Sequence, residues 1–341
     1  MYEREVDQVL LRSWLVACPS DRVKEPRDFF VWSQLGQSVM IVRTDDRRLV
    51  AWHNVCQHRG SIIVSEESGR CSLGAFKCPW HGFAYDLEGR LVHTPFKEAF
   101  DPDQLRGLRT PTVRVEEWSG FLWICLDDSA PSLRESLGDF ASQVEWYGFD
   151  SWDPDYSGTW QIDANWKVAL DAFNETWHVP FAHRNTVRGG LLWKDATIEI
   201  HRPHSLISIP LRRYPGPHAP ELDRRDVTLC HFFIFPNTIF NCFPTLAQCF
   251  SAWPTGPRST TLTAWSMSPP RPADVDEAEW RRRADRSWEN FCEVVDEDRA
   301  VLAAAGRVHG SKGYSRNIFN AAEGRLTAFH REIAERVGEP G

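Results

Sequence analysis

Two short fragments that combine cysteine and histidine constrain this 341-residue chain more than any other feature. One residue separates Cys56 from His58, and two residues separate Cys78 from His81. Each spacing fits the tip of a tight loop, so two facing loops can offer two thiolates and two imidazoles to a metal centre. A glycine follows each fragment within two residues, and glycine lets the backbone pack closely against such a centre.

The mixed ligand pairs predict an iron–sulfur centre. In a 2Fe-2S cluster of the Rieske type, one iron keeps two Cys and the other takes two His. The main alternative is a structural zinc ion, which also accepts two Cys and two His. Zinc modules usually pair like with like, as Cys-x-x-Cys and His-x(3 to 5)-His. Because each pair here is mixed, we predict that Cys56, His58, Cys78 and His81 bind a Rieske cluster.

Composition indicates an intracellular globular protein. The length suits about two domains with sizeable cores, and 25% charged and 42% hydrophobic residues are ordinary values. A net charge of -8 argues against nucleic-acid binding. The first residues lack a basic region followed by an apolar stretch, and no apolar run reaches about 18 residues. Nine cysteines form no compact disulfide framework, so we expect a cytoplasmic protein without a membrane segment.

The pattern of short apolar runs predicts an α+β protein with two domains. Residues 1–153 form an N-terminal segment and a small all-β domain, in which the loops within 53–83 hold the cluster. Its expected strands are 29–32, 38–42, 49–53, 83–86, 91–93, 112–117 and 121–126.

Residues 154–341 form the second predicted domain, which contains an antiparallel sheet. A helix begins near residue 165, and a long helix covers 277–305, with Asp276 as its N-cap and Gly306 as its stop. The expected strands of this domain are 156–162, 197–201, 206–211, 227–234, 238–243, 246–253 and 260–268, and its last helix is 321–337.

A second group of metal-binding residue types begins on the helix near residue 165. Asp171, Glu175 and His178 are four and three residues apart, which places them on one face of a continuous helix. His183 lies about 140 degrees further around an ideal helix and can join them only if the helix ends. Pro180 ends or kinks the helix, so the two imidazoles can converge.

Two histidines and one carboxylate form the facial triad of non-heme Fe(II) oxygenases, which leaves coordination positions open. We expect the carboxylate from Asp298, because a lone acid in an apolar helix stripe is costly unless it is paired or bound to a metal. A pairing of Asp298 with Arg299 or Arg325 is the alternative. Asp296 and Glu297 fall off this stripe and are predicted to be surface charges. The stripe consists of Ala284, Trp288, Phe291, Val295, Asp298 and Leu302.

Taken together, these residues resemble the Rieske non-heme iron oxygenases, through the oxygenase (alpha) component of aromatic-ring-hydroxylating systems. The resemblance implies a Rieske domain joined to a helix-grip, START-like catalytic domain. It also implies a mononuclear Fe(II) and usually a head-to-tail homotrimer. The matching pieces are Cys56-x-His58, Cys78-x-x-His81, Asn165-Trp166-Lys167, Glu175-x-x-His178, His183 and the Glu297-Asp298 pair.

The same resemblance assigns roles to site residues. His178, His183 and Asp298 would bind the mononuclear iron, and Glu175 would link the partner subunit's His81 to His178. Most members have Asp at the bridging position, and Glu there resembles the branch that acts on quaternary ammonium compounds. Asp171 replaces an Asn found near the iron in some arene dioxygenases. Glu175 and Asp171 are therefore our candidate catalytic residues.

The function expected from the resemblance is that of a terminal oxygenase that uses O2 to hydroxylate a small, largely apolar aromatic or cyclic substrate. The chain has no Gly-x-Gly-x-x-Gly or Walker lysine motif, so electrons from NAD(P)H should arrive through a separate flavin reductase, with or without a ferredoxin. Oxidative O- or N-demethylation, including that of quaternary ammonium compounds, is the alternative reaction. A non-catalytic Rieske electron carrier or ligand-binding protein is the alternative from another class.

The sixteen tryptophans and the aromatic strands of the second domain suit an apolar substrate cavity better than an aromatic cage for a cation. Much of the cavity wall is expected from Phe233, Thr238, Phe240, Cys242, Leu246 and Phe250.

Overall fold

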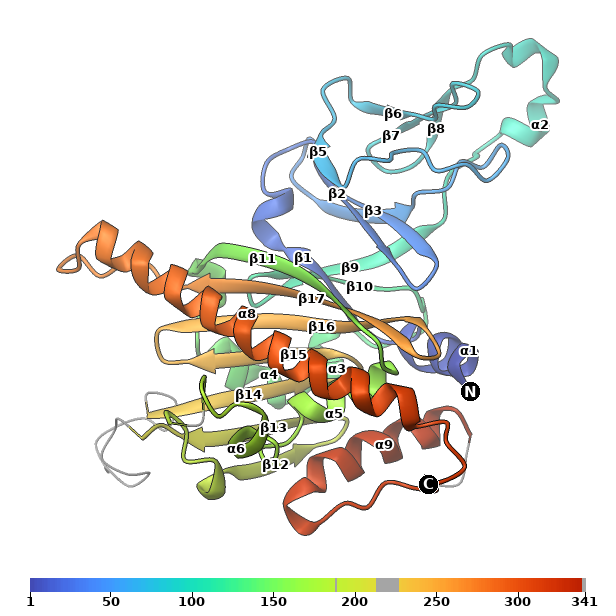
Figure 1. Ribbon diagram of the computed structural model, residues 1–341. Coiled ribbons are helices and arrows are strands. Elements are labelled where there is room, and N and C mark those ends of the chain that lie inside the picture. Colours follow the sequence, from blue (N-terminus) through green and yellow to red (C-terminus); the bar gives the residue numbers. More distant parts are fainter. Residues whose placement is uncertain (188, 213–226, 339–341) are drawn as a thin grey trace. The chain divides into compact units, whose positions relative to one another are not determined.

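The computed structural model describes residues 1–187, 189–212 and 227–338 (Figure 1). Contacts between residues divide the chain into two compact units, residues 11–136 and a second unit that joins residues 1–10 to the chain from residue 137 onward. Residues 1–10 and 137–153, which the sequence analysis assigned to the first domain, therefore pack with the second unit. No helix in the described ranges is long and apolar enough to cross a membrane.

The unit of residues 11–136 consists mainly of strands, as the sequence predicts. A seven-stranded antiparallel sheet has the order β1 (Leu15–Pro19), β10 (Phe121–Cys125), β9 (Thr112–Trp118), β4 (Leu49–His53), β3 (Gln37–Arg43), β2 (Asp28–Gln34) and β5 (Ser68–Arg70). A second sheet contains β6 (Ala75–Lys77), β7 (Ala84–Asp86) and β8 (Leu91–His93).

One apolar core connects these two sheets. Trp52 of β4, Phe76 of β6 and Tyr85 of β7 are buried in the same cluster, together with Cys56 and Cys78. The indole nitrogen of Trp52 donates to the backbone oxygen of Leu87 at 3.1 Å, so this large side chain is buried with its polar atom satisfied. The core therefore holds both cysteine-bearing loops against the sheets.

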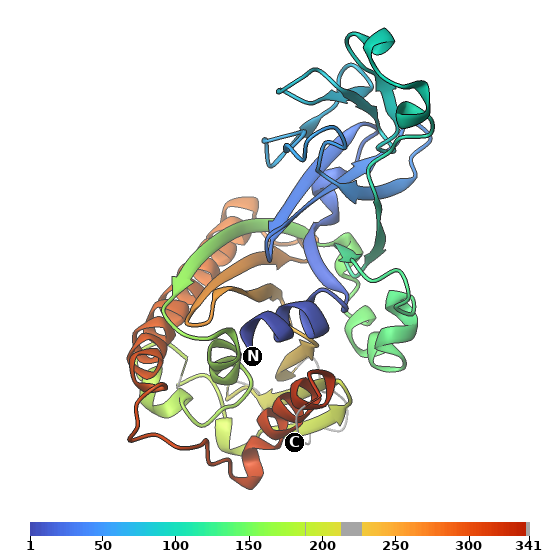
Figure 2. The same cartoon turned by 90° about the vertical axis from the view of Figure 1, so that its right-hand side faces the viewer.

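The second unit contains a seven-stranded antiparallel sheet covered by helices. Its strand order is β11 (Asp153–Ile162), β17 (Ser259–Ser268), β16 (Leu246–Gly256), β15 (Thr238–Phe243), β14 (Thr228–Ile234), β13 (His204–Pro210) and β12 (Thr197–His201). The covering helices are α5 (Trp166–Phe173), α6 (Val179–Ala182), α8 (Glu277–Val308) and α9 (Gly324–Arg336). Figures 1 and 2 show α8 crossing this sheet, and α8 also contacts β11.

The remaining helical segments of both units are short. These are α1 (Tyr2–Glu5), η1 (Val6–Leu10), η2 (Ser20–Val23), η3 (Lys97–Ala99), α2 (Pro102–Leu105), α3 (Leu133–Leu137), α4 (Phe140–Glu145), η4 (Phe149–Ser151), η5 (Trp193–Asp195) and η6 (Ala321–Glu323).

Both faces of the second sheet are covered. On one face, Phe140 of α4 contacts Phe232 with ring centroids 5.8 Å apart, and Phe149 stacks on Phe240 at 5.6 Å. These contacts explain why residues 137–153 belong to this unit. On the other face, Phe329 of α9 contacts Phe233 at 5.3 Å.

The long helix α8 begins as predicted but ends later. Asp276 caps it by accepting from the backbone N–H of Glu279 at 3.0 Å. The helix then runs through Gly306, which was expected to stop it, and ends at Val308. A Cβ atom at Gly306 would lie 2.0 Å from the backbone oxygen of Asp163, so this glycine permits close packing of the helix instead of terminating it.

Candidate active site

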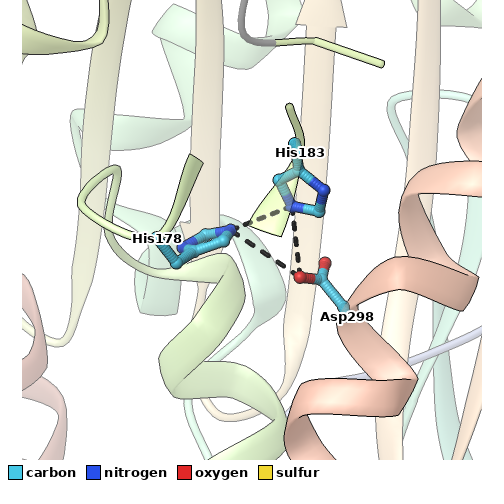
Figure 3. Close-up of side chains that lie close together, drawn as sticks. All are labelled: His178, His183 and Asp298. Carbon is cyan, nitrogen blue, oxygen red and sulfur yellow. Dashed lines mark hydrogen bonds and ion pairs between the residues drawn. The ribbon is translucent and has the colours of Figure 1, made fainter. Parts of the chain in front are cut away.

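Three side chains from separate segments of the second unit meet at one point (Figure 3). His178 and His183 flank the short helix α6, and Asp298 projects from α8. Nε2 of His183 lies 3.1 Å from Nε2 of His178 and 3.1 Å from Oδ1 of Asp298. Nε2 of His178 lies 3.8 Å from the same oxygen. The structure thus brings together the two histidines and the carboxylate that were predicted from the sequence to form one metal site.

A carboxylate contacts the second ring nitrogen of each histidine. Nδ1 of His178 lies 2.5 Å from Oε1 of Glu175, and Nδ1 of His183 lies 2.7 Å from Oε2 of Glu297. Burial of His183 opposes its charged form, but Asp298 and Glu297 outweigh burial and raise its pKa. A carboxylate on Nδ1 orients the ring and leaves Nε2 available to a metal ion.

The prediction that Glu297 is merely a surface charge is wrong. Besides its contact with His183, its carboxylate accepts a hydrogen bond from Oγ1 of Thr186 at 2.7 Å. Glu297 lies about 100 degrees around α8 from Asp298, at the edge of the buried stripe, where it faces the segment after α6. Helical periodicity cannot show that the segment after α6 packs beside this edge.

The surroundings of Asp298 fit a bound cation. Asp298 is buried, and among the described residues Oδ2 has no hydrogen-bond partner. The alternative ion pairs are not formed, because Arg299 binds Asp296 at 2.7 Å and Arg325 binds Ser205 and His231. A buried carboxylate oxygen without a partner is costly, and a metal ion at the cluster removes that cost. This donor set matches that of mononuclear iron sites with open coordination positions.

The expectation that Asp171, Glu175 and His178 share one helix face is wrong. Helix α5 begins close to its predicted start, with Asn165 as its N-cap, but ends at Phe173. Glu175 lies in the following turn, where its carboxylate accepts from the backbone N–H groups of Trp177 and His178. These local bonds replace the helix and direct Glu175 toward the ring of His178.

Asp171 remains on α5, away from the histidine cluster. Its carboxylate accepts from Nε2 of His330 on α9, at 2.8 and 3.0 Å. It does not border the cavity beside the cluster. The structure therefore shows Asp171 connecting two helices.

The four predicted cluster ligands lie on two loops of the first unit. Cys56 and His58 follow β4, and Cys78 and His81 lie between β6 and β7. Each loop turns in the same way, since the N–H of Gly60 donates to the oxygen of Cys56 and the N–H of Gly82 donates to that of Cys78. Both glycines have a φ of +74°, which favours glycine.

The donor set of these loops fits a Rieske cluster. Both thiols are buried and free, whereas the two histidines are partly exposed, with ring centroids 4.6 Å apart. Burial raises the pKa of Cys56, and the neighbouring Cys78 raises it further. In a Rieske cluster, two Cys bind one iron and two His bind the other. Buried thiols and partly exposed imidazoles suit a cluster with inner sulfur ligands and outer nitrogen ligands.

Tyr85 is a contact of the cluster loops that the sequence analysis did not find. Its hydroxyl oxygen accepts from the backbone N–H of Gln57 at 2.9 Å and lies 3.3 Å from Sγ of Cys56. Since the N–H group occupies the oxygen as acceptor, the hydroxyl proton is available to the sulfur. Burial raises the pKa of Tyr85, so the proton stays on the oxygen at neutral pH. No local sequence pattern distinguishes this tyrosine from a core residue.

A cavity of about 720 Å³ adjoins the histidine–carboxylate cluster. His178, His183 and Asp298 border it, α8 contributes Phe291, and the sheet contributes the opposite wall. The lining from the sheet comprises Ile207, Ile209, Leu211, Leu229, His231, Asn241, Phe243, Leu246, Gln248 and Phe250.

The predicted cavity wall is only partly correct. Leu246 and Phe250 line the cavity, but Phe233 packs under α9 instead. Thr238, Phe240 and Cys242 alternate with the lining residue Asn241 and point to the opposite face of the sheet. Because both faces are covered and apolar, the sequence alternation could not identify the face with the cavity.

Two family profiles match the chain. Residues 13–113 match the Rieske [2Fe-2S] domain. Residues 149–339, more than half of the chain, match the ring hydroxylating alpha subunit (catalytic domain).

The chain belongs to the ring hydroxylating alpha subunit family.

This alpha subunit is similar in sequence to a monooxygenase and to a component of a dioxygenase system. It is 29% identical over 273 residues to the chloroplastic choline monooxygenase of Amaranthus tricolor, a match that covers 77% of this chain and 59% of the relative. It is 30% identical over 205 residues to the large oxygenase component of the naphthalene 1,2-dioxygenase system of Pseudomonas aeruginosa, covering 56% and 43%. The match therefore spans less than two thirds of the length of either relative.

Solved structures share the fold of this alpha subunit. The quaternary ammonium Rieske monooxygenase CntA with a bound inhibitor superimposes with a TM-score of 0.84 at 19% identity, covering 98% of this chain and 91% of that chain. Naphthalene 1,2-dioxygenase with bound indole gives a TM-score of 0.79 at 20% identity, covering 99% and 90%. The predicted α+β architecture, with a Rieske domain and an antiparallel-sheet catalytic domain, is confirmed. The two profiles also imply the predicted cofactors, a Rieske 2Fe-2S cluster and a mononuclear iron.

Proposed function

We propose that this chain is the terminal oxygenase component of a Rieske non-heme iron system, which hydroxylates a small, largely apolar aromatic or cyclic substrate with O2. The observation that carries the proposal is the meeting of His178, His183 and Asp298 beside a cavity. A protein that only carries electrons does not require a second metal site that opens onto a substrate-sized cavity.

Each residue of the cluster has a defined task in this proposal. His178, His183 and Asp298 would bind the mononuclear iron, and Cys56, His58, Cys78 and His81 would bind the Rieske cluster. When bound, these groups supply oxygen activation and one-electron transfer. Glu175 and Glu297 hold the two imidazoles so that both Nε2 atoms face the same point. The apolar part of the lining, which includes Phe250 and Phe291, would place the substrate beside that point.

We infer that Glu175 also serves electron transfer between subunits of a homotrimer. Its carboxylate already contacts Nδ1 of His178, and the family resemblance suggests the partner subunit's His81 as the second contact. Asp171, with its hydrogen bonds to His330, would serve as a positioning residue that connects α5 to α9.

Electrons would come from NAD(P)H through a separate flavin reductase, with or without a ferredoxin. We also propose a cytoplasmic location and no nucleic-acid partner, in agreement with the net charge of -8.

Oxidative O- or N-demethylation, including that of quaternary ammonium compounds, is the second candidate reaction. The similarity to choline monooxygenase and to CntA supports it, as does the glutamate at position 175. The naphthalene 1,2-dioxygenase relatives support the oxidation of arenes and a role in aromatic compound catabolism. Both reactions use the same residues and differ in which group of the substrate faces the metal site.

Product analysis tests the proposal and its alternatives. The purified protein would be incubated with a flavin reductase, NADH and 18O2, together with naphthalene, anisole, benzoate or choline. We expect mass spectrometry to show 18O in a hydroxylated ring or side chain. Release of formaldehyde or another aldehyde as the main product would favour demethylation or choline-type oxidation. If reduced protein consumes no O2 with any probe, the non-catalytic carrier would replace the oxygenase.

A further inference from the structure

A row of polar side chains crosses the apolar sheet face that lines the cavity. His231 of β14 lies opposite Asn241 of β15, and Asn241 lies opposite Gln248 of β16, so all three project from one face. Nδ2 of Asn241 donates to Oε1 of Gln248 at 2.9 Å. Gln248 is 2% exposed, and no described residue accepts a hydrogen bond from its Nε2. A nearly buried amide donor is therefore directed into the cavity.

Arg325 determines which nitrogen of His231 carries the proton. Its Nη1 lies 3.0 Å from Nδ1 of His231, and its Nε donates to Oγ of Ser205 at 2.7 Å. A guanidinium group can only donate, so Nδ1 of His231 is the acceptor and the proton of the neutral ring is on Nε2. Burial and the charge of Arg325 both lower the pKa of His231, which keeps the ring neutral. His231 thus borders the cavity as a fixed Nε2–H donor.

Arg325 places a buried positive charge beside His231 of the cavity wall. Arg325 is 1% exposed, and no carboxylate in the described ranges forms an ion pair with it. Three further arginines, Arg212, Arg283 and Arg286, line the cavity, of which Arg283 and Arg286 are exposed and form ion pairs with Glu279. Its only acidic lining residues in the described part of the chain are Glu175 and Asp298, and both belong to the histidine cluster. A buried cation without a counter-ion favours an anionic ligand nearby.

We propose that His231 and Gln248 bind the carboxylate of the substrate, so that the substrate is a small aromatic or cyclic acid. This inference rests on the proposed function and names the substrate class of the same site. A carboxylate accepts from both donors and supplies a counter-ion for Arg325, which has none among the described residues. The ring of the acid then packs against Phe250 and Phe291, toward His178 and His183.

Other substrate classes fit these donors less well. A neutral hydrocarbon would leave the N–H groups of His231 and Gln248 without acceptors from the ligand. A quaternary ammonium group would meet the N–H donors of His231 and Gln248, with the charge of Arg325 behind His231, and it has no lone pair to accept from them. Carboxylate recognition therefore separates the expected substrate from quaternary ammonium compounds that lack a carboxylate, such as choline.

Binding without turnover tests the inference. Calorimetry on the anaerobic, unreduced holoenzyme would compare benzoate and 2-naphthoate with the corresponding amides and with benzyltrimethylammonium. We expect one or both acids to bind at least about tenfold more tightly than the amide or the cation. His231→Leu and Gln248→Met should each weaken binding of the acid by about tenfold or more. His231→Gln should retain part of the affinity, because its amide can donate in place of Nε2–H.

His201→Gln is the matched control, because this histidine on β12 does not border the cavity. Its affinity for the acids should equal that of the wild type. Gln248→Met provides an independent variant if His231→Leu does not fold. Equal binding of acid and amide, no binding of either acid, or unchanged affinity in both His231→Leu and Gln248→Met would each overturn the inference.

The outcome separates this inference from the proposed function. Oxygenation of neutral arenes without a preference for acids rejects only the carboxylate assignment. Acid binding that depends on His231, in a protein without mononuclear iron, rejects the oxygenase and leaves the ligand class intact.

Discussion

The hydroxyl of Tyr85 illustrates how one side chain can adjust the redox centre. It lies 3.3 Å from Sγ of Cys56, with its oxygen already occupied by the N–H of Gln57. A donor to a cluster sulfur stabilises the reduced state more than the oxidised state, because the reduced cluster carries more negative charge.

The variant Tyr85→Phe should therefore lower the reduction potential of the Rieske cluster. The cluster should remain bound, since Cys56, Cys78, His58 and His81 are unchanged. A redox titration followed by visible absorption or EPR measures the shift. An unchanged or higher potential would show that the hydroxyl donates elsewhere.

At the scale of residues, spacing identified the donors but not the groups that orient them. His178, His183 and Asp298 could be combined because their residue types and positions limit the chemistry. Glu297 and Tyr85 escaped detection because their partners lie 114 and 29 residues away in the chain, and only tertiary packing brings them together.

At the scale of elements, Gly306 sets how closely α8 approaches the segment before α5. A Cβ atom there would lie 2.0 Å from a backbone oxygen, which cannot move aside without shifting the chain. Gly324 at the start of α9 has no atom within 4 Å of the corresponding position. These two helical glycines therefore form a matched pair.

We predict that Gly306→Ala lowers the free energy of unfolding by about 1–3 kcal/mol or more, because it overpacks the helix against backbone. Gly324→Ala should be neutral or stabilising by up to about 1 kcal/mol, since alanine favours the helix. Thermal or denaturant unfolding measures both variants. Equal stability of the two would contradict the close approach of α8.

Most strands and the long helix could be predicted because their apolar periodicity is regular. β1 was missed because its short run of five buried residues has no alternation. The end of α5 was missed because Glu175 forms bonds to backbone N–H groups that compete with the helix. The stop assigned to Gly306 was wrong because glycine serves both helix ends and close packing, and only the fold distinguishes these uses.

At the scale of the whole molecule, electrons must pass between two metal centres, and we propose that Glu175 connects them. Its carboxylate contacts His178, while the proposed second contact belongs to the partner subunit's His81. Light scattering should accordingly give the mass of a homotrimer, three times 39.2 kDa for this chain.

Glu175→Gln should keep both metal sites occupied but slow oxidation of the reduced Rieske cluster in a single turnover. The side-chain amide has nearly the same shape as the carboxylate, but it has one acceptor oxygen instead of two and carries no charge. Asp195→Asn, an exposed acid on η5, serves as the control and should react like the wild type. Rapid oxidation of the cluster in Glu175→Gln would show that electrons take another route.

The iron content of the wild type and of Asp298→Ala shows whether His178, His183 and Asp298 hold a mononuclear iron besides the Rieske cluster. We expect about three irons per chain in the wild type and about two in Asp298→Ala, which keeps the visible Rieske absorption but loses turnover. Asp296→Ala, an exposed position two residues earlier on α8, should keep about three irons. Two irons per chain in the wild type, or full turnover in Asp298→Ala, would show that these three residues do not form the catalytic iron site.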